Sequence, residues 1–443
     1  MSDTIAAIAT PRGDGGVSII RISGPEALSI LRALCPKLPE HPQRAQLYLR
    51  PLSFAQQTGD HALVAFFQSP SSYTGEDVVE LQAHGGAYNT QLILSWALEA
   101  GARLATPGEF TRRAFENGRV DLSQAEAIAD LIAARSAGAH RLALRSLQGS
   151  LRVVVESLQD ALVVALAEIE ASIDFPEEDL SFLSHPQISG ALQKTRARCL
   201  ELAATHQAGR LLREGAEVAL VGRPNVGKSS LLNALTGEER AIVTEEAGTT
   251  RDLIRVELEL QELRVTLIDT AGLREVTSLA ERLGVERARV LLQEAHLRLL
   301  LLDGSQPLSE EDHEILAQVS SLPHLIVKTK SDLASVWELP NSIAISSKTA
   351  SGLTELREAM VKLISKGVDL SAEIAVAHVH QRDALRRAAG FIEAALSGID
   401  RRLHPELLAE ELHAGRDALG EITGRSSREE ILDELFKRFC VGK

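Results

Sequence analysis

The feature that most constrains this chain is a loop at residues 222–229, Gly-Arg-Pro-Asn-Val-Gly-Lys-Ser. It fits the pattern G-x-x-x-x-G-K-[ST] of a phosphate-binding P-loop. An apolar run of strand type precedes it, at residues 217–221, and a segment with leucines on one helical face follows it. Glycines let backbone N–H groups converge on phosphate oxygens, and the start of the helix adds a positive dipole end. In such a loop Lys228 reaches the outer phosphates and the Ser229 hydroxyl binds Mg²⁺.

Length and composition predict a protein of several domains. The chain has 443 residues, which predicts two to four domains, and 44% of them are hydrophobic. No apolar run approaches the roughly 20 residues that span a bilayer, and the first residues lack the pattern of a signal peptide. Three cysteines lie far apart in the sequence, which predicts free thiols. We therefore expect a cytoplasmic protein.

The charge balance bears on nucleic-acid binding. The net charge is −14, and an acidic chain binds nucleic acid poorly without help because phosphate affinity comes mainly from Lys and Arg. An RNA substrate would need a local basic surface or a partner. Arg141, Arg145 and Arg152 could share one helix face, but a solvated face is the favoured interpretation.

Four segments differ in pattern, and we expect domain boundaries between them. Residues 1–118 mix short strands with a few helices, an α+β pattern. Residues 119–213 repeat apolar side chains at three- and four-residue steps, which predicts long amphipathic helices. Residues 214–368 alternate strands with helices around the P-loop, and residues 369–443 are helical again.

Individual elements follow from these patterns. In the first segment we expect strands at 17–23, 61–68 and 78–82 and a helix at 89–100. Further helices are expected at 188–212, 382–396, 405–419 and 428–439, the last opened by a capping box from Ser427 to Glu430. In the P-loop segment we expect strands at 218–221, 255–260, 264–268, 298–302, 325–327 and 342–345. The second and third of these form a hairpin, and the whole is a doubly wound α/β sheet with ligands at the carboxyl ends of its strands.

Companion motifs follow the P-loop in order. Residues 248–252, Gly-Thr-Thr-Arg-Asp, lie at the distance of a switch loop, where a threonine hydroxyl completes the Mg²⁺ shell. Asp269-Thr270-Ala271-Gly272 follows an apolar run, so Asp269 can orient a Mg²⁺-bound water and Gly272 can donate its N–H to a γ-phosphate. Thr329-Lys330-Ser331-Asp332 places an aspartate to accept two hydrogen bonds from guanine, and residues 346–348, Ser-Ser-Lys, close the base pocket.

Departures from the usual motifs bear on mechanism. Thr329 stands where asparagine is common, and its hydroxyl is expected at the base edge. Leu273 follows Gly272, where Ras-like enzymes have a glutamine that orients the attacking water. No residue marks itself as an arginine finger, but a monovalent cation held by Asn225 could supply the missing charge. Glu281 is a candidate to position water.

Motifs along nearly the whole length resemble those of the MnmE (TrmE) family. They include Tyr-Thr-Gly-Glu-Asp at 73–77, Pro-Gly-Glu-Phe at 107–110, Asp-Leu-Ser-Gln-Ala-Glu-Ala at 121–127 and the end Cys-Val-Gly-Lys at 440–443. The start of the chain matches too, through Asp3-Thr4-Ile5, Gly15-Gly16-Val17 and residues 21–25. The P-loop alone would not distinguish this family from other GTPases.

The resemblance implies a tRNA-modifying GTPase that forms homodimers. The family acts with the FAD-dependent protein MnmG and installs an aminomethyl-type group at C5 of the wobble uridine. Its N-terminal domain resembles folate-binding one-carbon domains and dimerises, and its GTPase domain is inserted into a helical domain. A potassium ion fills the arginine-finger role.

The resemblance also assigns residues. It implies Mg²⁺ ligands Ser229 and Thr250, K⁺ ligands Asn225, Thr244, Glu246 and Thr249, and catalytic roles for Glu281, Lys228 and Asn225. It implies folate contacts by Arg21, Glu80, Arg119 and Lys443, and Cys440 is either a nucleophile or a packed thiol. The expected GTP-binding residues are Asn225, Val226, Gly227, Lys228, Ser229, Ser230, Thr244, Glu245, Glu246, Ala247, Gly248, Thr249, Thr250, Asp269, Thr270, Ala271, Gly272, Thr329, Lys330, Asp332, Ser346, Ser347 and Lys348.

Two other functions stay open at this stage. One is a ribosome-assembly switch that binds RNA with GTP as a timer, since such proteins share the P-loop and the Gly-Thr-Thr-Arg-Asp sequence. They carry a second GTPase domain or a basic RNA-binding module, and this chain shows neither. The other is a folate-binding scaffold whose GTPase is only regulatory.

Overall fold

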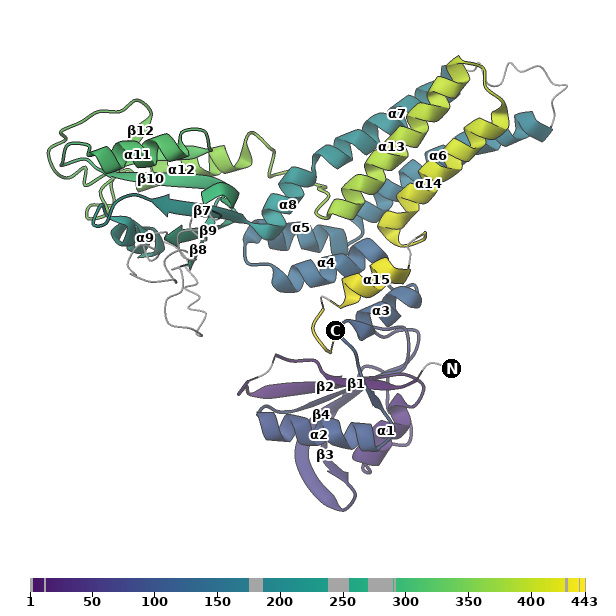
Figure 1. Ribbon diagram of the computed structural model, residues 1–443. Helices are drawn as coiled ribbons and strands as arrows, with labels where there is room; N and C mark the ends of the chain where they lie inside the picture. Colours follow the sequence, from purple (N-terminus) through teal and green to yellow (C-terminus); the bar gives the residue numbers. More distant parts are fainter. Residues whose placement is uncertain are drawn as a thin grey trace, which may run out of the picture. The chain divides into compact units, whose positions relative to one another are not determined.

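Figure 1 shows the computed structural model, which describes residues 3–11, 13–174, 186–237, 255–269, 290, 292–426, 429–437 and 439–442. The chain divides into two compact units. The first comprises Met1–Ala129, Ser146–Leu192 and Ala394–Lys443, and the second Asp130–Arg145 and Gln193–Glu393. Each unit contains a six-stranded sheet.

The sheet of the first unit is almost entirely antiparallel. Its strands are β1 (Ile5–Ile8), β2 (Val17–Ser23), β3 (Leu47–Phe54), β4 (Gln57–Phe67), β5 (Val78–His84) and β6 (Arg103–Leu104), in the order β3-β4-β5-β2-β1-β6. Among the described strands of this sheet, only β6 and β1 pair in parallel. Helices α1 (Ala27–Leu34) and α2 (Ala87–Glu99) pack on this sheet around a buried cluster that includes Ile20, Leu81 and Trp96. The strand predicted at 17–23 and the helix predicted at 89–100 are confirmed, and α1 and β3 were not predicted.

Helices make up the rest of the first unit. They include α3 (Glu109–Glu116), α6 (Ser150–Asp174), α14 (Pro405–Thr423) and α15 (Glu429–Phe436). Helices α6 and α14 lie side by side (Figure 1). Helix α15 ends at Phe436, three residues before the predicted end, because the chain turns there and the Phe439 ring packs on that of Phe436. The predicted capping box lies outside the described residues at Ser427.

Other helices carry residues of the second unit. They are α4 (Leu122–Ala133), α5 (Ala137–Leu147), α7 (Pro186–Ala204), α8 (His206–Glu214) and α13 (Val379–Asp400). The single helix predicted at 188–212 is wrong, since it breaks at Thr205. The Thr205 hydroxyl accepts the N–H of Val376, and Gly209 lies so close to the Val376 carbonyl that an added Cβ would be 2.3 Å from it. The break therefore lets α8 pack against the chain at Val376.

The three arginines expected on one helix face lie on two helices. Arg141 and Arg145 belong to α5, and Arg152 to α6. Arg141 pairs with Glu262, and Arg145 donates to the backbone carbonyl of Glu373. Both arginines remain partly exposed, in keeping with a solvated face, and each also contacts a partner there.

The sheet of the second unit is the predicted doubly wound sheet. Its strands are β7 (Ala216–Val221), β8 (Arg255–Leu260), β9 (Leu263–Asp269), β10 (Leu297–Asp303), β11 (His324–Thr329) and β12 (Ser342–Ala344), in the order β12-β11-β10-β7-β9-β8. All described pairings are parallel except the predicted β8–β9 hairpin. Helices α9 (Lys228–Gly237) and α12 (Leu353–Ser365) cover one face, and α11 (Glu310–Val319) covers the other.

This topology places the ligand-binding edge. Beyond β7 the chain first builds β8 and β9 on one side and then crosses to β10 on the other. Ligands of such sheets bind at the carboxyl ends of the strands where the order reverses, which here is between β7 and β10. In the described part of the chain, no helix is both long and apolar enough to cross a membrane.

Candidate functional site

The P-loop connects β7 to α9 and has the backbone of a phosphate cradle. Gly222 and Gly227 both have positive φ, and Asn225 is left-handed with a φ of 62°. A Cβ on Gly222 would lie 2.5 Å from the carbonyl oxygen of Leu301, so only glycine fits there. Lys228 is buried and its ammonium donates to the carbonyls of Gly222 and Arg223, at 2.7 and 2.8 Å. The loop thus holds its lysine over its own backbone, while Asn225 and Ser229 are exposed.

The base-reading motif follows β11 and is fixed to the P-loop. The Thr329 hydroxyl is buried, 2.7 Å from the carbonyl of Val226 in the P-loop and 3.1 Å from that of Leu302. The expectation that this hydroxyl lies at the base edge is corrected, because its partners are two backbone carbonyls. Thr329 instead ties the base-reading motif to the phosphate-binding loop.

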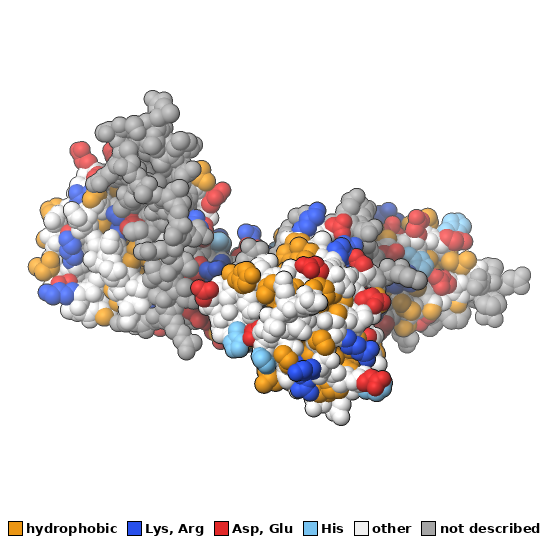
Figure 2. All heavy atoms as spheres, turned by 90° about the horizontal axis from the view of Figure 1, so that it is seen from below, with side chains coloured by type: hydrophobic (Ala, Val, Ile, Leu, Met, Phe, Trp, Pro, Cys, Tyr) orange, Lys and Arg blue, Asp and Glu red, His pale blue; other side chains and the backbone are white. Residues whose placement is uncertain are grey.

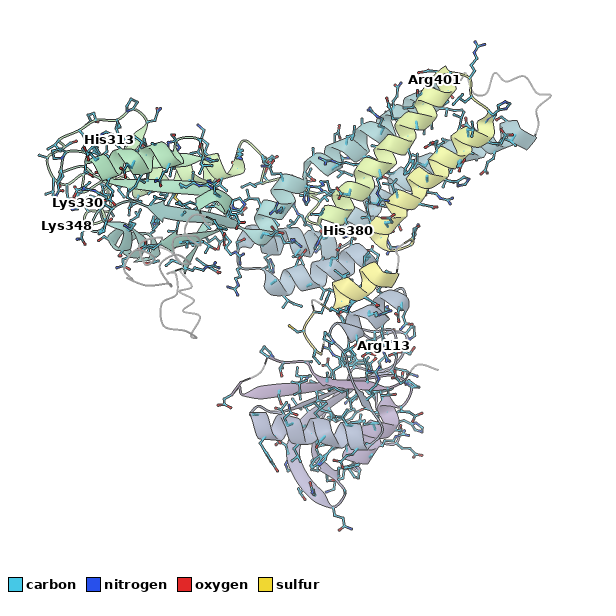
Figure 3. The ribbon with its side chains drawn as sticks, viewed as in Figure 1. Arg113, His313, Lys330, Lys348, His380 and Arg401 are labelled. Atoms are coloured by element: carbon cyan, nitrogen blue, oxygen red, sulfur yellow. The ribbon has the colours of Figure 1, made fainter. Side chains whose placement is uncertain are left out.

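Asp332 is held by the last motif of the predicted site. The Ser346 hydroxyl donates to its carboxylate at 2.7 Å. This bond holds the pKa of Asp332 below its usual value, and the charge of Lys348 acts in the same direction. Asp332 is therefore a carboxylate at neutral pH, as an acceptor of two guanine N–H groups must be. Figure 3 labels Lys330 and Lys348 close together at one end of this sheet.

Part of the predicted nucleotide site lies outside the described residues. Thr244, Glu245, Glu246, Ala247, Gly248, Thr249, Thr250, Thr270, Ala271, Gly272 and Glu281 lie outside the described residues, as does Leu273. Asp269 is described, and it is buried at the carboxyl end of β9, next to β7. The structure thus brings together the P-loop, Asp269, Thr329, Asp332 and the residues at 346–348 on one sheet edge.

A second group of predicted residues meets in the first unit. Arg21 on β2 lies directly opposite Glu80 on β5, and its guanidinium donates to that carboxylate at 2.9 and 3.1 Å. The same guanidinium lies 5.2 Å from the ring centre of Tyr73 and 5.8 Å from that of Phe110. It also lies 3.5 Å from the carbonyl of Gly442. The end of the chain is therefore docked at Arg21.

The remaining predicted residues of this group are placed only in part. Arg119 packs beside Gly75, where an added Cβ would lie 3.3 Å from its side chain. Lys443 lies outside the described residues. Cys440 is exposed, and its carbonyl accepts the N–H of Gly108 at 3.4 Å. Sequence reasoning missed the aromatic pair Tyr73 and Phe110, although both stand in motifs that it had quoted.

A partly buried ion network supports this group. Arg113 is buried and donates to Glu76, to Asp3 and to Glu109. Glu109 also pairs with Arg103 at 2.6 Å. Burial alone would raise the pKa of Glu109, but hydrogen bonds from Arg103, Thr106 and Arg113 lower it to about 2. The network joins the start of β1, the 73–77 loop and α3, which carry Tyr73 and Phe110.

Comparison with known proteins decides the family. A model of the MnmE helical domain matches residues 122–440, a span that encloses the parallel sheet of the second unit. A model of the TrmE N-terminus, described as a GTP-binding protein, matches residues 4–119. The chain belongs to the MnmE family.

Relatives within the MnmE family match this chain from end to end. The protein named tRNA modification GTPase MnmE in Nitrosomonas europaea is 42% identical over 455 positions, which cover 100% of this chain and 99% of the relative. The protein of the same name in Neisseria gonorrhoeae is 43% identical over 454 positions, with 100% of both chains covered. A third, in Heliobacterium modesticaldum, is 40% identical over 466 positions with the same coverage. The predicted family, the predicted fold and the assignment to a family of GTPases are thus confirmed.

Proposed function

We propose that this chain hydrolyses GTP in a tRNA modification complex and acts on C5 of the wobble uridine together with a FAD-dependent partner, MnmG. The group added is of the aminomethyl or carboxymethylaminomethyl type. The observation that carries the proposal is the joining of the P-loop to the base-reading motif through Thr329, in a chain that matches tRNA modification GTPases over its full length. The joining of the two motifs supports a guanine-nucleotide site, and the full-length match supports tRNA modification over other uses of GTP.

The residues of the site fit a nucleotide with Mg²⁺. Ser229 is exposed at the start of α9, where its hydroxyl can bind the metal, with Thr250 as the second protein ligand. Lys228 neutralises charge on the outer phosphates, and Asp269 orients a water of the metal. Bound Mg²⁺ would stabilise the charge that develops on the phosphate oxygens.

A monovalent cation fits the site beside Asn225. Asn225 is exposed, and its backbone is left-handed within the P-loop. We propose K⁺ ligands Asn225, Thr244, Glu246 and Thr249, and we propose that Glu281 positions the attacking water. The cation would supply the positive charge that other GTPases obtain from an arginine finger. Pairing of two GTPase domains assembles this site and drives the conformational change.

The Arg21 group fits a reduced folate. The Arg21 guanidinium is paired to Glu80 and lies over the rings of both Tyr73 and Phe110, so charge and flat apolar surface are presented together. We propose that Arg21, Glu80, Arg119 and Lys443 bind a tetrahydrofolate derivative, 5,10-methylene or 5-formyl, with Cys440 nearby as a possible nucleophile. The contact of the Gly442 carbonyl with Arg21 supports this proposal, because Gly442 directly precedes Lys443 in the sequence.

Homodimerisation and RNA binding belong to the same proposal. Leu49 and Leu63 face each other on the paired strands β3 and β4 and are exposed, as is Leu47, so the first unit offers apolar surface to a second copy. In the view of Figure 2 basic and acidic side chains are interspersed over the described surface. This pattern favours tRNA held partly by the partner protein. We propose the division 1–118, 119–213, 214–368 and 369–443, and a cytoplasmic location, which the three free cysteines support.

The first experiment compares GTP turnover by the purified chain in KCl and in NaCl at equal ionic strength. We expect about tenfold or greater stimulation by K⁺, lost in Asn225→Ala, because the cation replaces a catalytic charge. Asn233→Ala, an exposed asparagine on α9, is the matched control and should keep the stimulation.

Equal rates in the two salts would contradict the cation proposal and favour a protein activator, as in a ribosome-assembly switch. The tRNA proposal is tested separately, by mass analysis of the wobble nucleoside after incubation with the partner, GTP and a tetrahydrofolate. Unmodified uridine under these conditions would contradict it.

A further inference from the structure

Asp303 occupies a central position that no predicted motif includes. It is the last residue of β10, which lies between β7, the strand of the P-loop, and β11, the strand of the base-reading motif. Its carboxylate is therefore at the carboxyl edge where the ligand-binding loops converge. The side chain is only 5% exposed.

Four hydrogen bonds converge on Asp303. Lys330 of the base-reading motif donates its ammonium to Oδ2 at 2.6 Å. The N–H and hydroxyl of Ser305 donate to Oδ1 at 2.9 and 2.7 Å. The indole N–H of Trp337 donates to the backbone carbonyl at 2.7 Å. Burial alone would raise the pKa of Asp303, but the donors from Lys330 and Ser305 keep it below the usual value, so the group is charged.

Lys330 has an unusual backbone that this pair supports. Its φ is 58°, in the left-handed region, which is strained for a residue with a Cβ. The neighbouring backbone is fixed by the bond from Ser331 N–H to the carbonyl of Ile345 and by that from Leu333 N–H to the carbonyl of Lys330. The direction of the lysine stem is thus set by the fold, and Asp303 fixes its far end.

We propose that Asp303 is a positioning residue for guanine-nucleotide binding, which holds Lys330 in place beside Asp332 before the nucleotide enters. The inference rests on the nucleotide site proposed above. A lysine side chain that samples several rotamers would lose this freedom when the nucleotide binds, which lowers the affinity. The Lys330 side chain is already held by Asp303, so it loses less. Asp303 acts through Lys330 and contacts no part of the nucleotide itself.

The test measures the affinity of the full-length chain for GDP carrying a ribose-linked fluorophore. Asp303→Asn keeps the size of the side chain and removes its charge, and we expect a Kd about tenfold higher, as for loss of one hydrogen bond to a charged group. The KM for GTP should rise by a similar factor while kcat stays at the wild-type value, because neither Asp303 nor Lys330 is among the residues proposed to act on the phosphates. A merely structural role would lower the melting temperature and leave the Kd unchanged.

A double-mutant cycle tests whether Asp303 acts through Lys330. Lys330→Met should also weaken GDP binding, and adding Asp303→Asn to it should cost no more than about twofold further. Full additivity of the two losses would contradict the proposal. The ratio of GDP to IDP affinity should stay at its wild-type value in Asp303→Asn, because Asp332 reads the base. A changed ratio would mean that Asp303 acts on Asp332 instead.

Controls separate the possible failures. Glu338→Gln removes a different ion pair of the same region, from Glu338 to Lys328, and should leave the Kd unchanged. If Asp303→Asn does not fold, Ser305→Ala removes one donor that orients the carboxylate, and a Kd two- to threefold higher is expected. An unchanged Kd in a folded Asp303→Asn variant, or in Ser305→Ala, overturns the role of Asp303 and leaves the proposed nucleotide site standing. A wild-type chain that fails to bind GDP overturns the proposed nucleotide site itself.

Discussion

The two six-stranded sheets of this protein bring their candidate residues together in different ways. In the second unit the parallel strands all deliver loops to one edge, and each candidate residue follows the carboxyl end of a strand. In the first unit the antiparallel strands pair residues across the sheet, and Arg21 meets Glu80 because the register of β2 and β5 sets them opposite. One site is built by strand ends and the other by strand register.

The difference between strand ends and strand register explains which of the two sites can be predicted from sequence motifs. A loop after a strand is contiguous, so its motif is read directly along the chain. The two residues of a cross-strand pair can be far apart in the sequence, and Arg21 and Glu80 are separated by 59 positions. Only the register of the paired strands in the tertiary structure shows that such residues are in contact. The predictions below test each kind of site separately, beginning with the largest effect.

The largest effect is expected at the strand-end site. Lys228→Ala removes the ammonium that the P-loop holds, and we expect kcat/KM for GTP to fall by at least about a hundredfold, as for removal of a group that stabilises transition-state charge. The measurement is phosphate release under saturating Mg²⁺. Lys362→Ala, an exposed lysine on α12, is the control and should keep the wild-type rate. Folate binding by the first unit should survive in both variants, and its loss in Lys228→Ala would show that the two sites are not separate.

The next effect concerns the ion network behind the cross-strand site. The pKa of Glu109 is lowered to about 2 from 4.5, so the stability it contributes is present above pH 4.5 and is lost as the pH falls toward 2. By linkage, the free energy of unfolding of the wild type should fall by about 2 kcal/mol more than that of Glu109→Gln between pH 6 and pH 3.

Urea unfolding followed by Trp96 fluorescence measures this loss, in a Trp337→Phe background so that only the first unit reports. Trp96 suits the purpose because it is buried in the core of that unit. Parallel pH profiles of the two proteins would mean that Glu109 contributes no stability through its charge.

The smallest effect is expected at the cross-strand site itself. Arg21→Gln removes the charge that stacks on Tyr73 and Phe110, and we expect the Kd for 5-formyltetrahydrofolate to rise about tenfold, as for loss of one charged contact. Calorimetric titration measures it. Arg50→Gln changes a half-buried arginine on β3 that stacks on Tyr48 and serves as the control. Equal affinity in Arg21→Gln and wild type would remove Arg21 from the folate site.

Prediction from sequence worked best where local pattern and fold coincide. The apolar strands of the second unit and their hairpin were predicted, because strands buried on both faces are continuous apolar runs. The helix expected at 188–212 failed because Thr205 and Gly209 meet Val376, which is far away in the sequence. The contact of Thr329 is also distant in the sequence, because the Val226 carbonyl lies 103 residues earlier. A local motif could therefore not predict it, and Thr329 was assigned to the base.

The sequence by itself determined the family, the phosphate-binding loop and the order of the nucleotide motifs, because each of these is written in contiguous residues whose chemistry is local. Only the tertiary structure decided what the side chains between the motifs do. It joined Lys330 to Asp303, Thr329 to the P-loop and Arg21 to Glu80, two aromatic rings and the chain end. Such contacts depend on strand order and register, which arise from the packing of the whole chain.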